Sequence, residues 1–141
     1  MAIKNYTSVV PPSRSISKMQ ELLGENGAKQ VSVEYGGDGK PSALCFKMHV
    51  GQLLMSFRLT VDVAALLAAM RSDPKVPSGS CTTKQAERTA WKNRYEWLAL
   101  QMAEIRSGQA RLEQLLLGYA EVNEGETLFE AMLNNEQLIT D

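Results

Sequence analysis

Apolar residues recur at every second position in three stretches between residues 31 and 59, which is the period of half-buried β-strands. They are Val31, Val33 and Tyr35, then Leu44, Phe46, Met48 and Val50, then Leu53, Met55, Phe57 and Leu59. The glycine-rich residues 36–41 and the pair Gly51-Gln52 supply the turns between these stretches. We therefore predict an antiparallel meander that is packed on one face and polar on the other.

Residues 5–10 are also β-prone and end at Pro11-Pro12, so they predict a short edge strand. The sheet would then have three or four strands. Side chains on alternate strand positions share a face. The polar face of the predicted sheet therefore carries Cys45, Lys47, His49, Ser56 and Arg58.

Apolar residues at helical spacing flank the meander on both sides. Before it, Ser13 or Ser15 provides the N-cap of a helix that ends at Gly24 or Gly27. After it, Asp62 caps a short helix with one apolar stripe. The meander is therefore expected to have a helix at each end.

A long helix is predicted over residues 82–107, where Thr82 and Gln85 match the capping-box pattern. Two shorter helices follow it, one ending near Gly118 and one beginning after Thr127. The second half of the chain is therefore predicted to be helical.

These elements describe an α+β fold, in which an N-terminal helix and a three- to four-stranded antiparallel meander precede a helical C-terminal half. Proline, serine and glycine are frequent in residues 72–81, as is typical of a hinge or loop. We predict an α+β subdomain over residues 1–71, a loop over 72–81 and a helical subdomain over 82–141. One compact domain would contain all three.

The order helix, three strands, helix also describes the double-stranded RNA-binding domain. That domain uses basic residues at the start of its last helix to hold phosphates across the duplex groove. Here the corresponding segment reads TVDVAALLAAM, which is acidic to neutral. The sequence therefore disfavours this class.

The charge of the chain is small in total but unevenly distributed. The 141 residues are 44% hydrophobic and 22% charged with a net charge of −1, which argues against a strongly basic nucleic-acid coat and against an acidic DNA mimic. Seven acidic residues and no basic residue follow Arg111, so residues 1–111 carry +6. The acidic end is predicted to face solvent or a basic partner.

The setting predicted from the sequence is the cytoplasm. Residues 1–14 lack the apolar run of a signal peptide, and no stretch of the chain approaches the length of a membrane span. Cys45 and Cys81 form no CxxC pair, which is typical of free thiols in a reducing cytosol.

Large aromatic side chains are concentrated in the predicted long helix. Trp91 and Tyr95 lie on one helical stripe, whereas Trp97 lies on another face, so this part of the helix is apolar nearly all round. Such a helix is buried in a core or in an oligomer interface. Core packing explains most of the pattern, and a homo-oligomer interface is the alternative.

Basic residues recur at four-residue intervals in the first half of the same helix. Lys84, Arg88 and Lys92 form this series, and Arg94 lies close by. The pattern suits either a nucleic-acid backbone, with an aromatic side chain for base stacking, or a solvated face with local pairs such as Lys92 with Glu96.

Catalytic and metal-binding patterns are weak in this sequence. His49 is the only histidine, and Cys45 lies roughly 13 Å from it along the predicted strand, too far for a direct dyad. One histidine and two distant cysteines do not make a structural zinc site. The GGDGK segment lacks the spacing of a phosphate-binding loop. We therefore expect no catalytic residues, no metal and no cofactor, and a metabolic enzyme is disfavoured.

Several segments together resemble a family of small uncharacterised phage and prophage proteins. They are the opening MAIKNYTSVVPPSRSISKMQELLGENGAKQVSVEY, the later QAERTAWKNRYEWLALQMAEI and the ending Gly125 to Glu130, which follows a G-x-T-L-x-E pattern. The resemblance spans most of the chain, but its motifs are structural. It implies a viral origin and a host-cytoplasmic setting, and it carries no activity.

These observations predict a non-enzymatic phage accessory protein that binds nucleic acid or a protein that handles nucleic acid. The predicted binding residues are Lys84, Arg88, Lys92 and Arg94, with Lys47 and Arg58 on the polar sheet face. The alternative is an anti-defence inhibitor that binds a host immune complex, for example a CRISPR complex, or its nucleotide signal. A homo-oligomer without a membrane association is expected in either case.

Overall fold

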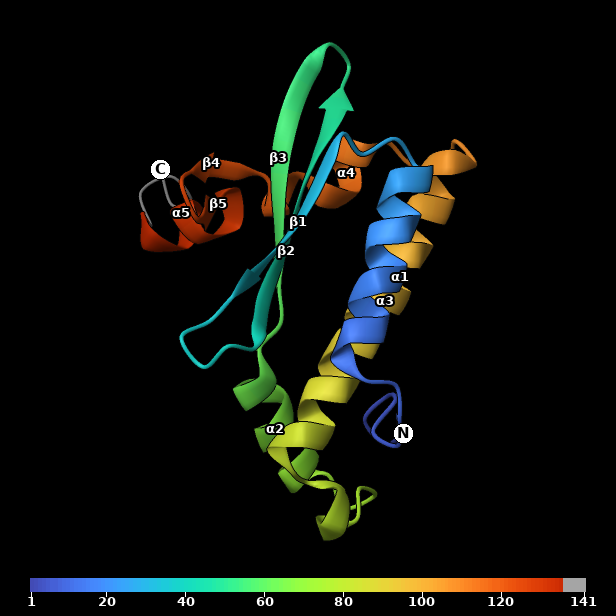
Figure 1. Ribbon diagram of the computed structural model, residues 1–141, viewed down its shortest axis with the longest axis vertical. Helices are drawn as coiled ribbons and strands as arrows, with labels where there is room; N and C mark the ends of the chain where they lie inside the picture. The colour runs from blue at the N-terminus through green and yellow to red at the C-terminus, as the bar shows by residue number, and fades with distance from the viewer. Residues whose placement is uncertain (136–141) are drawn as a thin grey trace. The chain divides into compact units, whose positions relative to one another are not determined.

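The structure, a computed structural model that describes residues 1–135, is an α+β protein (Figure 1). This confirms the predicted class, with an N-terminal helix, a three-stranded antiparallel sheet and helices after it. The helices are α1 (Pro12–Glu25), α2 (Val63–Ser72), α3 (Thr83–Arg106), α4 (Leu112–Leu116) and α5 (Leu128–Asn134), with 3-10 turns η1 (Ser78–Ser80) and η2 (Leu117–Tyr119). The strands are β1 (Gln30–Tyr35), β2 (Pro41–Val50), β3 (Leu53–Thr60), β4 (Glu121–Asn123) and β5 (Glu126–Thr127).

Two compact units make up the fold, and each combines separated segments of the chain. Unit 1 contains Met1–Leu22 and Val61–Leu100, whereas unit 2 contains Leu23–Thr60 and the chain from Gln101 onward. The sequence suggested a different division, into an N-terminal and a C-terminal subdomain joined by a loop over residues 72–81. That boundary stays a prediction about which parts of the chain fold independently.

The sheet of unit 2 is a meander of strand order β1-β2-β3, with antiparallel pairing throughout (Figure 1). Phe46 pairs with Phe57 across β2 and β3, and their rings stack with centroids 5.3 Å apart. Both rings are buried, as the alternation predicts. A two-residue turn joins β2 to β3, and Gly51 adopts a positive φ of 63° there, which glycine tolerates without steric cost.

Residues 5–10 form no strand, so the predicted edge strand is wrong. Instead, Asn5 lies in the left-handed region at φ 64°, and the chain turns there. The polar side chains of α3 take the hydrogen bonds that a sheet would have provided. The Thr89 hydroxyl donates to the Asn5 carbonyl at 2.9 Å, and the Gln85 amide donates to the carbonyls of Tyr6 and Ser8, both at 2.8 Å.

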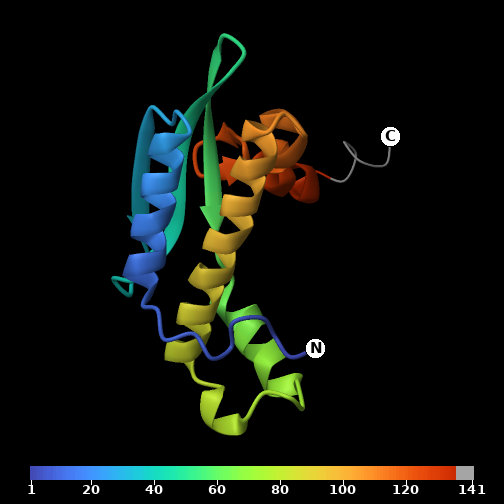
Figure 2. The same cartoon turned by 90° about the vertical axis from the view of Figure 1, so that its right-hand side faces the viewer.

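This N-terminal segment crosses the first half of α3 and ends near α2 within unit 1 (Figure 2). The backbone N–H of Ile3 donates to the carboxylate of Asp73 at 3.0 Å. A small apolar core lies beneath it, formed by the buried residues Met70, Val76 and Ala86 with Ile3, Tyr6, Val63, Leu66, Leu67 and Cys81 packed around them. The apolar stripe predicted for α2 is therefore the stripe that is buried.

The C-terminal part of unit 2 contains a hairpin that the apolar pattern did not indicate. Strands β4 and β5 pair with each other, and Ala120 forms a single β-bridge to Phe57 of β3. Thr127 then caps α5 in a capping box with Glu130, as the predicted helix start requires. Glu124 lies in the turn of this short hairpin, between the two strands.

Candidate nucleic-acid interface

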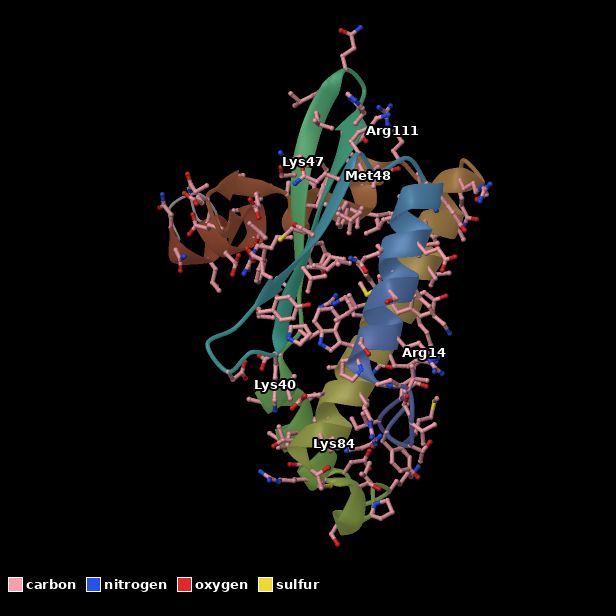
Figure 3. The ribbon with its side chains drawn as sticks, in the orientation of Figure 1. Arg14, Lys40, Lys47, Met48, Lys84 and Arg111 are labelled. Atoms are coloured by element: carbon pink, nitrogen blue, oxygen red, sulfur yellow. The ribbon has the colours of Figure 1, made fainter. Side chains whose placement is uncertain are left out.

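Three basic side chains form a strip along the first half of α3, and we call Lys84, Arg88 and Lys92 the α3 strip. Figure 3 shows Lys84 near the start of this helix. Lys84 is exposed, and the other two are partly exposed. In the described part of the chain, none of the three forms an ion pair with a carboxylate. The helical rise places Lys84 and Lys92 about 12 Å apart along the axis.

The start of α3 positions this strip. Thr82 acts as the predicted cap, because its hydroxyl accepts the N–H of Gln85 at 3.1 Å. The side chain of Gln85 turns away from a reciprocal capping bond and holds the N-terminal segment instead. The same residue therefore both begins the helix and anchors the chain end to it.

Arg94 lies on a different side of α3 from the strip. It follows Lys92 by two residues, which turns it about 160° around the helix from that lysine. Its guanidinium lies 5.3 Å from the centroid of the Trp97 ring. Arg94 therefore joins an aromatic contact, and the structure does not bring it together with Lys84, Arg88 and Lys92.

The three large aromatic residues of α3 have different environments. Trp91 is only 1% exposed, so it is a core residue that no base or partner reaches in this conformation. Tyr95 and Trp97 are partly exposed. Tyr95 is three residues after Lys92, a spacing that places the two on neighbouring positions of the helix surface.

Lys18 of α1 belongs to the same neighbourhood, although the sequence pattern did not indicate it. Its ammonium lies 5.7 Å from the centroid of the Tyr95 ring, which is cation–π geometry. Arg14 precedes Lys18 by four residues on α1, and both are exposed. Their four-residue spacing indicated a shared face of α1. The contact of Lys18 with Tyr95 is what connects this face to α3.

The pair predicted between Lys92 and Glu96 does not form. Glu96 interacts with the N-terminal segment, accepting a hydrogen bond from the Asn5 side chain at 2.8 Å and lying 3.8 Å from the Lys4 ammonium. Lys92 therefore keeps its charge available to solvent or to a ligand. This outcome removes the local-pair interpretation for that residue.

Lys47 and Arg58 both lie on the polar face of the sheet in unit 2, as predicted. Lys47 is exposed on β2, and the next residue, the buried Met48, points to the other face of the sheet (Figure 3). Arg58 is opposite Cys45 in the β2–β3 register, and its side chain is only 18% exposed. Its guanidinium forms an ion pair with Glu34 at 3.1 Å. Arg58 is therefore committed to an intramolecular partner, and Lys47 is not.

Cys45 shares this face with carboxylates, and its thiol is suppressed as a nucleophile. Gln30, Ser32, Glu34, Phe46, Lys47, Ser56 and Glu121 line a shallow cavity of about 150 Å³ together with Cys45. Burial first, and then the charges of Glu34 and Glu121, together raise the pKa of the Cys45 thiol from its ordinary 9.0 to about 11. Both cysteines are free, as expected.

We expect Cys45 to alkylate roughly 100-fold more slowly in the folded protein than after denaturation at pH 8, because only the thiolate reacts. The measurement is the rate of iodoacetamide labelling followed by mass spectrometry. A Cys81→Ser background isolates the signal, and the same variant in denaturant is the control. Equal rates in both states would contradict the suppressed thiol.

Charge is separated between the two units. Unit 1 has nine basic and five acidic residues, a net charge of +4, whereas unit 2 has six basic and eleven acidic residues, a net charge of −5. The sequence showed only an acidic end after Arg111. The α3 strip lies within Val61–Leu100 and therefore belongs to unit 1, the unit with the positive net charge.

The described part of the chain, residues 1–135, contains no group of three or more histidine, cysteine, aspartate or glutamate side chains placed to hold a metal ion. None of its helices has the length and apolar character needed to span a membrane. Comparison of the chain with protein-family models, with curated proteins and with solved structures finds no match.

Proposed function

We propose that this is a non-enzymatic phage accessory protein that binds nucleic acid through unit 1. The observation that supports this most directly is the α3 strip, whose three cations are exposed or partly exposed and lack carboxylate partners in the described residues. Surface lysine and arginine side chains in local ion pairs contribute little to phosphate binding. Cations without such partners are available to replace the counterions of a phosphate backbone.

A single strand suits this surface better than a duplex. Tyr95 offers a partly exposed ring beside Lys92, and base stacking on an aromatic ring requires an unpaired base. Lys18, whose ammonium lies 5.7 Å from the centroid of that ring, adds a further cation to this surface. Strip and ring together therefore favour single-stranded DNA or RNA.

Replacing Arg88 and Lys92 together by alanine is expected to weaken binding to a short single strand at least tenfold at about 50 mM salt. Three phosphate contacts predict a slope of about −2 for log K against log salt, and the loss of two contacts reduces it to about −0.7. Fluorescence anisotropy with a labelled oligonucleotide over a salt series measures both quantities.

The matched control is Lys29→Ala with Arg106→Ala, which removes two exposed cations from unit 2. This variant should keep the wild-type slope, because it leaves the α3 strip intact. An equal loss in both double variants would show that net charge alone drives binding. No binding by the wild-type protein at low salt would overturn the proposal.

Inhibition of a host immune complex is the second candidate function, and the net charge of −5 on unit 2 favours it. An acidic surface suits the basic channel in which such a complex holds its nucleic acid. We would challenge bacteria carrying a defence system with phage in the presence of each variant. This candidate would be favoured over nucleic-acid binding by two results. The variant Glu124→Gln with Glu126→Gln would no longer protect the phage from the defence system, and the Arg88 and Lys92 double variant would still protect it fully.

A further inference from the structure

A cavity of about 380 Å³ lies in unit 2, separate from the α3 strip in sequence and in chemistry. Its lining comes from three places in the unit, namely the end of β3, the η2 turn and the start of α5, and consists of Arg58, Thr60, Gly118, Tyr119, Thr127, Phe129 and Glu130. This volume is at the lower end of the range for small-molecule sites. A single flat ring system with a sugar is the size of ligand that it suits.

Arg58 supplies hydrogen-bond donors to this cavity. Its Nε and Nη2 atoms both lie 3.1 Å from the same oxygen of Glu34, Oε2. The guanidinium has five N–H donors, so this one-oxygen arrangement leaves the Nη1 group uncommitted among the described residues. The Arg58 side chain is 18% exposed, so this group reaches solvent and can donate to a ligand carbonyl oxygen in the cavity.

Glu130 supplies an acceptor to the same cavity. Its Oε1 atom accepts the backbone N–H of Thr127 at 2.9 Å and the Thr127 hydroxyl at 3.1 Å. These bonds, the backbone N–H first, lower the pKa of the Glu130 carboxyl, and the charge of Arg58 lowers it further. The carboxylate is therefore ionised at neutral pH, with its second oxygen available to accept N–H groups.

Phe129 gives the cavity an aromatic wall. It is 62% exposed although it is the bulkiest apolar residue of α5, and it lies next to Gly118, where an added Cβ would already be 3.9 Å from the Phe129 Cβ. This is an ordinary van der Waals distance, so the η2 turn packs close to the start of α5 at this wall. A planar ligand would cover this ring and remove apolar surface from water.

Charge excludes a polyphosphate as the preferred occupant. The single cation Arg58 has Glu34 and Glu130 as neighbours, and unit 2 as a whole carries −5. Additional negative charge would be repelled. The ligand chemistry that remains is an uncharged planar heterocycle with N–H donors for the carboxylate and a carbonyl acceptor for the guanidinium.

We propose that this cavity binds a nucleobase of the guanine type, stacked on Phe129, with its N–H edge toward Glu130 and its carbonyl oxygen toward Arg58. The base comes either from a free nucleoside or from an unpaired nucleotide of a strand, and both present the same edge. Adenine lacks the carbonyl oxygen and is the natural negative comparison. This site is independent of the α3 strip.

The test is a titration of the ¹⁵N-labelled full-length protein with guanosine and with adenosine, followed by amide chemical shifts. Guanosine should shift the resonances of residues 118–119 and 127–130, and adenosine should bind at least tenfold more weakly. Phe129→Ala should weaken guanosine binding about tenfold or more, the range expected for the loss of one stacked ring. Leu133→Ala on the same helix is the matched control, because it is equally exposed at 61% and does not line the cavity.

A second variant, Glu130→Gln, removes the charge while glutamine still serves in the capping box, so α5 is preserved. It should abolish the preference for guanosine over adenosine without changing the dispersion of the spectrum.

A short guanine-containing strand tested on the Arg88 and Lys92 double variant separates the two sources of the base. Shifts in the cavity with guanosine alone indicate a free nucleoside, whereas shifts only with the strand indicate a base in a chain. No shift at these residues with either ligand, or an equal loss in Leu133→Ala, would overturn the proposal and leave the α3 strip untouched.

Discussion

Replacing Trp91 by alanine is expected to lower the free energy of unfolding by about 3–5 kcal/mol, which is the cost of removing a large aromatic side chain from a packed core. Trp91 is only 1% exposed and is the largest fully buried side chain of the described residues. A loss of this size is a large fraction of the stability of a small domain. Urea denaturation followed by circular dichroism measures it without relying on the tryptophan signal.

Leu100→Ala is the matched control for this variant. Leu100 lies on the same helix and is 58% exposed, so its truncation should change stability by less than about 0.5 kcal/mol. The comparison also decides between core and interface. If Trp91 served an oligomer interface, its replacement would change the mass seen by light scattering while leaving the unfolding free energy nearly unchanged.

Replacing Asn5 by alanine should destabilise the protein by about 2.5–5 kcal/mol through two separate effects. Alanine pays roughly 1–2 kcal/mol for the left-handed conformation at φ 64°. It also loses the side-chain amide that donates to Asn93 at 2.7 Å and to Glu96 at 2.8 Å, and hydrogen bonds to a charged group contribute about 1.5–3 kcal/mol. The unfolding free energy in urea is the measurement.

Asn5→Gly separates the two contributions, because glycine adopts the left-handed conformation without steric cost. Its expected loss is about 1.5–3 kcal/mol, which reflects the missing hydrogen bonds. Similar losses for alanine and glycine would show that backbone conformation is unimportant at this position. No loss in either would contradict the role of the N-terminal segment as an anchored part of unit 1.

The meander was predictable because its signal is local. Residues such as Phe46 and Phe57 alternate with polar neighbours, and the pleat of a strand turns that alternation into one buried face. Helix starts at Asp62 and Thr127 were equally readable, since a capping side chain bonds to an N–H only three residues away. In such elements the residues that decide the structure are neighbours in the chain.

Residues 5–10 show where this reasoning fails. Their β-prone composition was a correct description of propensity, but their partners are Gln85 and Thr89, about eighty residues away. Tertiary hydrogen bonds outweighed local preference there. The β4–β5 hairpin was missed for the same kind of reason, because strands this short carry too few alternating positions to give a signal.

The candidate interface was predictable in part. Four-residue spacing placed Lys84, Arg88 and Lys92 on one strip, because helical geometry is regular. Arg94, selected for its proximity in sequence, lies on another side of the helix beside Trp97, and its role in binding stays a prediction. Lys18 was absent from the prediction, since its contact with Tyr95 joins two different helices.

The sequence by itself determined the α+β class, the alternation of the meander, the caps at Asp62, Thr82 and Thr127 and the basic strip, because each depends on residues within a few positions of one another. The cap predicted at Ser13 or Ser15 is wrong, because α1 already begins at Pro12. Tertiary structure alone decided that charge divides between two units, that Trp91 is core and that Arg58 pairs with Glu34. It also decided that Arg58, Phe129 and Glu130 line one cavity. These features join segments far apart in the chain, and their pairing is set by the packing of whole elements, on which local patterns carry no information.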